Sequence, residues 1–134
     1  MGNMKRIKLL ATLLSAIIIL FLMSSCSENP ELKADKNLKA YVEKYDYKSN
    51  PRKIAKSLSI VGLDYSNKKY TIYIDVDSKK FLNKIKKGES TWKSKIITII
   101  PEKVMANLKT AKASICIEFA YYDKVIINVP NEDL

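Results

Sequence analysis

The stretch SIVGLDYSNKKYTIYIDV, residues 59–76, alternates apolar and polar side chains on both sides of a short polar segment, SNKK. Alternation with a period of two is typical of β-strands that bury one face. Placing Tyr65 opposite Tyr70 gathers the apolar residues of both strands on one face, whereas a slip of one residue would mix the two sets. The sequence therefore predicts a β-hairpin in this register. The apolar face holds Val61, Leu63, Tyr65, Tyr70, Ile72, Ile74 and Val76, and the polar face holds Asp64, Thr71, Tyr73 and Asp75.

A second hairpin is predicted near the end of the sequence, where apolar residues alternate over 115–121 and again over 125–129. The two sets share a face if Tyr121 pairs with Val125 across a three-residue loop, 122–124. Such loops usually contain a residue in the left-handed conformation, so we expect Asp123 or Lys124 to take it under strain. The opposite face would carry Cys116, Glu118 and Ala120.

Helix signals precede both hairpins. Asn29-Pro30 is a favourable helix start, and apolar residues then recur at helical spacing (Leu38, Tyr41, Val42, Tyr45), which predicts a helix over 30–47. Asn50-Pro51 repeats the start signal and predicts a short second helix through Ile54, Ala55 and Leu58.

Further helices are predicted between the two hairpins. Asp77-Ser78 can cap a helix over 79–87 that ends at Gly88. Residues 90–100 fit a helix by the spacing of Trp92 and Ile96, and a strand by the β-branched run KIITII. A helical piece ending by residue 100 is favoured, because Pro101 disfavours α geometry in the residue before it. Pro101 then opens another helix, with its inward side formed by Val104, Met105 and Leu108.

The order of these elements predicts an α+β fold. It would consist of a four-stranded antiparallel sheet made of the two hairpins, with helices packed on one face and an N-terminal helix before it.

The first 25 residues have the layout of a secretory signal peptide. A head with three positive charges precedes the apolar run LLATLLSAIIILFLM, residues 9–23, and two serines then lead to Cys26. At ~1.5 Å per residue this run would cover about 22 Å as a helix, which is short of the ~30 Å hydrocarbon core of a bilayer. An uncleaved membrane anchor is the alternative.

The residues MSSC, 23–26, resemble the lipobox of bacterial lipoproteins, with Met23 where that family usually has Leu. The resemblance implies cleavage before Cys26 and a diacylglycerol on its sulfur. The expected organisation is a signal peptide over 1–25, a lipidated tether over 26–30 and a single α+β domain over 31–134. The protein would then be lipid-anchored to the extracytoplasmic face of a cell membrane. In a host with two membranes, Ser27 after the lipidated cysteine would resemble the signal that sends lipoproteins to the outer membrane.

Composition removes several kinds of chemistry. The sequence contains no histidine, which excludes Ser–His–Asp and Cys–His catalysis and histidine-ligated metal sites. Cys116 is the only cysteine besides Cys26, so no internal disulfide is expected after lipidation. We considered other candidates for chemistry or binding and interpret them as structural; they are the carboxylates of Asp64, Asp75 and Asp77, the Cys116 thiol, the Trp92 ring, and Tyr65, Tyr70, Tyr73, Tyr121 and Tyr122 as a stacking surface. We therefore expect no catalysis, cofactor or metal.

Positive charge is concentrated in the middle of the sequence. Ten lysines lie between residues 79 and 112, opposed by Glu89 and Glu102, which gives a local charge of +8. In KKFLNKIKK, residues 79–87, the apolar side chains face one way, and the other face carries Lys79, Lys80, Lys84, Lys86 and Lys87. Such a face suits an anionic surface close to the lipid anchor, either lipid headgroups or wall polymers, and nucleic acid is disfavoured outside the cell. A solvated face of a lysine-rich protein is the alternative.

These observations favour a membrane-anchored surface lipoprotein that acts as a non-catalytic binding or accessory module at the cell envelope. One alternative is a superinfection-exclusion or immunity lipoprotein of phage or plasmid type, with a membrane protein as partner. Another is a carboxylate hydrolase that uses Asp75 and Asp77.

The first prediction concerns Cys26. Cys26→Ser should abolish fatty-acid incorporation and leave a larger precursor, because the modified sulfur and the cleavage signal are both lost. Metabolic fatty-acid labelling and gel mobility measure this, with Cys116→Ser as the control that should behave as wild type. Unchanged labelling of the Cys26 variant would overturn the lipoprotein interpretation.

Overall fold

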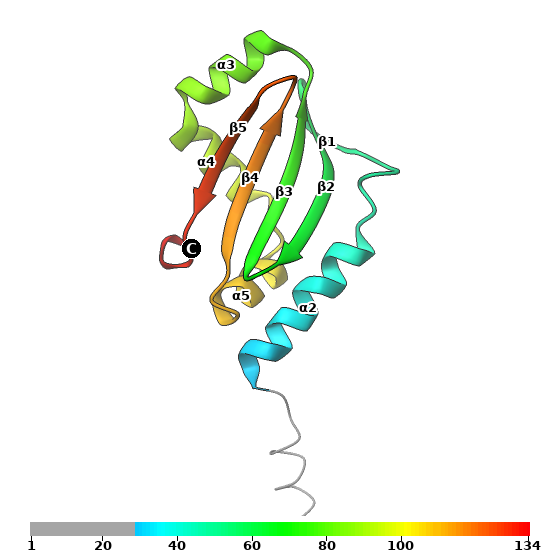
Figure 1. Ribbon diagram of the computed structural model, residues 1–134, viewed down its shortest axis with the longest axis vertical. Coiled ribbons are helices and arrows are strands. Elements are labelled where there is room, and N and C mark those ends of the chain that lie inside the picture. Colours follow the sequence, from blue (N-terminus) through cyan, green and yellow to red (C-terminus); the bar gives the residue numbers. More distant parts are fainter. Residues whose placement is uncertain (1–28) are drawn as a thin grey trace, which may run out of the picture.

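The computed structural model describes residues 29–134, so Cys26 and the predicted signal peptide lie outside the described residues (Figure 1). This part of the chain forms four α-helices and a five-stranded sheet and ends in a short 3-10 turn, Asn131–Asp133. In chain order the helices and strands are α2 (Pro30–Lys44), β1 (Arg52–Ala55), β2 (Leu58–Ser66), β3 (Lys69–Val76), α3 (Lys79–Lys87), α4 (Glu89–Thr98), α5 (Glu102–Thr110), β4 (Ser114–Ala120) and β5 (Lys124–Val129).

The sheet confirms the predicted α+β class but differs from the prediction in strand number and direction. Its order is β1-β2-β3-β4-β5, and β3 and β4 run parallel while the other neighbours are antiparallel. The four-stranded, wholly antiparallel sheet is therefore wrong. The physical reason is the connection between the hairpins: α3, α4 and α5 carry the chain back to the start of β3, where the Ser114 N–H donates to the Lys68 carbonyl at 2.8 Å.

The fifth strand, β1, lies where a short helix was predicted. Lys53 pairs with Ser59, and Ala55 pairs with Leu58. The spacing of Ile54, Ala55 and Leu58 is compatible with both a helix and a strand. Residues 52–55 form a strand because they pair with the edge of β2.

The first hairpin has the predicted register at its turn. Tyr65 pairs with Tyr70, and Asn67 and Lys68 have φ values of 53° and 59°, as a two-residue type I′ turn requires. A β-bulge between Ile60 and Gly62 then shifts the pairing by one residue. On the side of the bulge away from the turn, Ile60 is buried in the core position that was predicted for Val61. Val61 itself is only partly buried.

The second hairpin is offset by two residues from the predicted register. Phe119 pairs with Val125 and Ala120 with Lys124, so the loop is 121–123. A shift of two keeps the faces, and Cys116 does lie on the face opposite the buried Ile115, Ile117 and Phe119. The predicted strain is wrong, because the positive φ values of non-glycine residues in the described chain occur at Asn67, Lys68 and Lys112.

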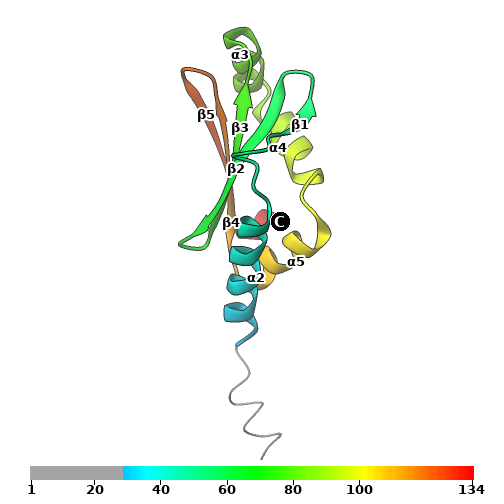
Figure 2. The same ribbon diagram turned by 90° about the vertical axis from the view of Figure 1, so that its right-hand side faces the viewer.

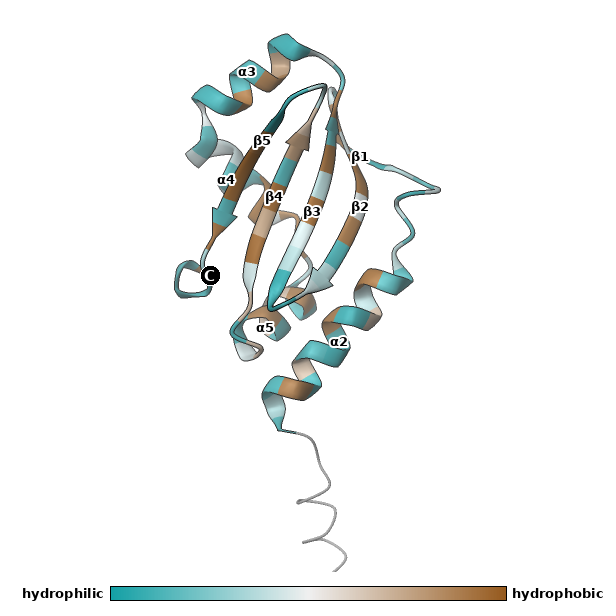
Figure 3. Cartoon of the chain, in the orientation of Figure 1, coloured by the Kyte–Doolittle hydropathy of each residue, from teal (hydrophilic) through white to brown (hydrophobic). Residues whose placement is uncertain are grey.

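The remaining helices begin at the predicted signals, although α2 ends at Lys44 and not at residue 47. The Asn29 side chain accepts a hydrogen bond from the Glu31 N–H at 2.8 Å and caps α2, and the Ser78 hydroxyl accepts one from the Phe81 N–H at 3.2 Å and caps α3. Helices α4 and α5 lie on one side of the sheet (Figure 2) and bury Ile96, Val104 and Leu108 against it. Hydropathy alternates along the central strands (Figure 3), and no helix of residues 29–134 covers the second face of the sheet, which we call the open face.

A polar network attaches α2 to the turn of the first hairpin. The Tyr65 hydroxyl donates to Asp35, and the Lys68 ammonium lies 2.6 Å from Asp35 Oδ2 and 3.1 Å from Glu31 Oε1. Burial alone would raise the pKa of Asp35, but the hydrogen bonds from Lys68 and Tyr65 outweigh it and lower that pKa. The turn residue Lys68, whose φ is 59°, therefore also contacts α2 through its side chain.

We predict that Asp35→Asn lowers the free energy of unfolding by about 1–2 kcal/mol at pH 7, because the charged acceptor of two hydrogen bonds is lost. A carboxylate whose pKa is lower in the folded than in the unfolded protein stabilises the fold at pH values above its unfolded pKa. The difference in free energy of unfolding between the variant and wild type should therefore stay constant from neutral pH down to about 4 and shrink below it. Denaturant unfolding at several pH values measures this. Asp123→Asn removes an equal charge from an exposed loop and should change little; a pH-independent deficit for the Asp35 variant would contradict the prediction.

Candidate functional site

The candidate site is the outer side of α3, which we call the basic face and define as Lys79, Lys80, Lys84, Lys86 and Lys87. The inner side fixes its orientation: Leu82 and Ile85 are 4% and 0% exposed, and the Phe81 ring packs edge-on against Trp92 with centroids 5.3 Å apart. Trp92 therefore acts as a packing residue between α3 and α4. The basic face is presented by a helix that the core holds in place.

The five lysines of the basic face are all exposed. At 3.6 residues per turn they cover an arc of roughly 160°. Within residues 29–134 none of the five has a carboxylate within ion-pair distance. The basic face therefore carries five positive charges that no carboxylate of residues 29–134 neutralises by an ion pair.

Helix electrostatics do not account for all of these lysines. Positive charge near a helix C-terminus is favourable, and Lys84, Lys86 and Lys87 lie there. Lys79 and Lys80 occupy the first turn, which contains no acidic residue and where the helix dipole disfavours cations. Packing of the apolar side must therefore outweigh an unfavourable electrostatic term in this helix.

The basic face lies far from the start of α2. The contact between Lys68 and Glu31 places the start of β3 beside the first turn of α2. Strand β3 then runs for eight residues, about 23 Å from first to last at ~3.3 Å per residue, before the chain enters α3. The two views agree that α3 and the first residues of α2 lie at opposite ends of the molecule (Figures 1 and 2).

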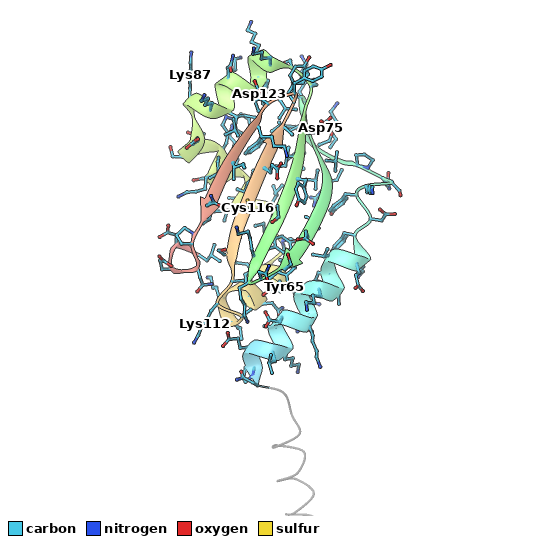
Figure 4. All side chains as sticks on the ribbon, in the orientation of Figure 1. Tyr65, Asp75, Lys87, Lys112, Cys116 and Asp123 are labelled. Atoms are coloured by element: carbon cyan, nitrogen blue, oxygen red, sulfur yellow. The ribbon has the colours of Figure 1, made fainter. Side chains whose placement is uncertain are left out.

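The ten central lysines do not form one patch. Lys112 lies at the end of the molecule opposite Lys87 (Figure 4). Lys95 stands over the Trp92 ring, with its nitrogen 4.4 Å from the ring centroid. The charge run in the sequence therefore divides into the basic face and scattered surface lysines.

The carboxylates considered for chemistry are exposed and lie apart. Asp64 accepts a hydrogen bond from the Ser66 hydroxyl near the turn of the first hairpin, whereas Asp75 and Asp77 lie at the other end of β3. Among the described residues no group of three acidic or cysteine side chains is placed to hold a metal ion. The three aspartates are not brought together as one site.

Cys116 lies on the open face of the sheet but is only 8% exposed. Burial raises the pKa of its thiol; Lys69 opposes this, and Glu118 adds to it. The Glu118 carboxylate itself pairs with the Lys124 ammonium at 2.7 Å. A buried thiol with a raised pKa is a poor nucleophile.

The tyrosines proposed as a stacking surface point in different directions. Tyr65 and Tyr70 are buried in the core, Tyr73 is on the open face, and Tyr121 and Tyr122 lie in the loop between β4 and β5. They form no common platform.

A groove that the sequence pattern did not suggest lies at the edge of the sheet. It has a volume of about 620 Å³ and runs between the end of α2 and the bulge of β2, with Tyr45, Tyr47 and Tyr73 among its lining residues. The Tyr45 and Tyr47 rings stack 5.7 Å apart, and Gly62 leaves room for the Tyr73 ring, whose Cδ2 would lie 3.4 Å from an added Cβ. One indication of this groove is present in the sequence, the pair Tyr45 and Tyr47 after α2. The bulge in β2, which also lines the groove, has no recognisable pattern in the sequence.

The comparisons with known proteins inform the fold. No family model matches the sequence, and no curated protein matches it. The structure is similar to the crystal structure of a "putative secreted protein" from Pseudomonas aeruginosa, with a TM-score of 0.61 and 11% sequence identity over 80% of this chain and 97% of that chain. Identity this low establishes a shared fold and no shared function. No helix in the described part of the chain is long and apolar enough to cross a membrane.

We predict that the Cys116 thiol reacts roughly a hundredfold more slowly with a thiol reagent in the folded protein than in denaturant, because it is buried and its pKa is raised. The measurement is made in a Cys26→Ser background, so that Cys116 is the only thiol, with Cys116→Ser added as the blank. Reaction of the folded protein at the rate of the denatured one would reopen a chemical role for this residue.

Proposed function

We propose that the protein is a lipid-anchored, non-catalytic binding module of the bacterial cell envelope, with the basic face as its binding surface. The observation that carries this proposal is that α3 presents five exposed lysines without acidic partners among residues 29–134. Such a surface attracts anionic material, and the buried side of α3 keeps the charges in a fixed arrangement.

Anchoring follows from the lipobox-like residues 23–26 and the short distance from Cys26 to the folded part. Helix α2 is capped by Asn29, three residues after the cysteine. Three residues span at most about 11 Å, so a lipid on Cys26 would hold the start of α2 close to the membrane surface.

A non-catalytic role fits the side-chain chemistry. Asp75 and Asp77 lie at the same end of β3 but are both exposed to solvent, the Cys116 thiol is buried, and the sequence has no histidine to act as a general base near pH 7. Hydrolysis through Asp75 and Asp77 has no support in this arrangement.

The superinfection-exclusion or immunity role has one observation in its favour. Large apolar side chains are exposed on the open face, where Ile126 is 52% and Tyr73 37% exposed, and in the loop between β4 and β5, where Tyr122 is 90% exposed. If these side chains form one continuous patch, that patch would be typical of a protein–protein contact. Loss of an exclusion phenotype on changing Ile126 and Tyr122, and not on changing the basic face, would favour this second function.

We predict that changing all five lysines of the basic face to Gln weakens binding to an anionic matrix more than an equal loss of charge elsewhere. The lipidated protein, which would begin at Cys26, is purified in a neutral detergent and eluted from the matrix with salt. The control changes Lys33, Lys53, Lys103, Lys109 and Lys112, all exposed, to Gln. The basic-face variant should elute at clearly lower salt than the control; equal elution would mean that only net charge matters and would overturn the proposed binding surface.

A further inference from the structure

We infer that the basic face binds a phosphate-bearing polymer of the cell wall, on the side of the molecule that points away from the membrane. This inference rests on the proposed function and names the ligand class of the same surface. The protein would then connect the membrane, through its lipid, to the polymer, through α3.

The first argument is distance. The start of β3 lies beside the first turn of α2, and the length of β3 separates this corner from α3 by about 23 Å. The Debye length at physiological salt is about 8 Å. In a molecule standing on its anchor, the basic face would therefore be too far from the headgroups to be attracted by them.

The second argument is the shape of the charge distribution. The five lysines occupy one side of a nine-residue helix, which is about 13 Å long and narrow. A linear polyanion with a phosphate in every repeat can follow such a strip with several charges at once and release its counterions, as polyanions do on binding lysines. The same end of the molecule also carries Asp75 and Asp123 (Figure 4) and Asp77, which lies two residues before α3. A flat bilayer pressed against this end would meet these acidic groups together with the lysines.

The third argument is the unfavourable electrostatics of α3 itself. Lys80 and Lys84 are four residues apart, Lys84 and Lys87 three apart, and such like-charged neighbours repel each other on a helix. Lys79 and Lys80 also oppose the helix dipole. A bound polyanion would relieve both effects, so binding should stabilise the folded protein.

The experiment uses the lipidated protein, which would begin at Cys26, inserted in neutral phosphatidylcholine vesicles, with poly(glycerol phosphate) as the probe. Trp92 is the only tryptophan and packs against Phe81 of α3, so its fluorescence reports on this helix. We expect a saturable change in Trp92 fluorescence that weakens steeply with salt. Gln at the five basic-face positions should weaken binding about tenfold or more, and the control set at Lys33, Lys53, Lys103, Lys109 and Lys112 should weaken it by no more than about threefold.

A second arm replaces the neutral vesicles by vesicles containing phosphatidylglycerol, without polymer. We expect no change in Trp92 fluorescence that depends on the basic face. If anionic vesicles alone produce that change and the polymer does not, the lipid surface is the ligand: the inference is overturned and the proposed function stands. If neither probe depends on the basic face, both are overturned. Failure of the protein to insert in vesicles would remove the anchor on which the inference depends.

Discussion

The parallel pairing of β3 with β4 is the constraint on which the rest of the structure depends. Antiparallel neighbours can be joined by a tight turn, but parallel neighbours need a connection that returns along the length of the sheet. Here α3, α4 and α5 make that connection and cover the face that carries Ile72, Ile74, Ile117 and Phe119. Helix α3 is the first part of this connection and begins directly after β3, so the basic face lies at the far end of that strand.

Local pattern was sufficient for the elements whose signals lie within a few residues of one another. The Tyr65–Tyr70 register, the Ser78 cap and the amphipathic α3 were all predicted, because a two-residue turn, a capping hydroxyl and helical spacing are properties of short segments. The prediction failed where a distant partner decides. Residues 52–55 became a strand because β2 offers an edge, and the direction of β4 depends on the path of three helices that no short pattern encodes.

The candidate site divides in the same way. The charge and periodicity of KKFLNKIKK identified the basic face, since an amphipathic helix fixes which side chains point outward. The distance between the basic face and the start of α2 could be seen only from the topology. The basic face was expected close to the lipid anchor, and the topology places it at the other end of the molecule. The tyrosine-lined groove could not be predicted, because Tyr47 and Tyr73 line it from separate elements, beside a bulge that shifts the strand pairing by one residue between Ile60 and Gly62.

Stability and surface charge are separated along the length of this molecule. At the α2 end, Lys68 is paired with Asp35 and Glu31, and this ion-pair network fixes the helix to the first hairpin. At the α3 end, the basic-face lysines have no such partners among residues 29–134, and their helix is held by Leu82 and Ile85, which are almost fully buried. Burial of apolar area is not weakened by Debye screening, whereas repulsion among the lysines is. The helix can therefore keep its place in the fold while its outer charges remain available to an anionic ligand.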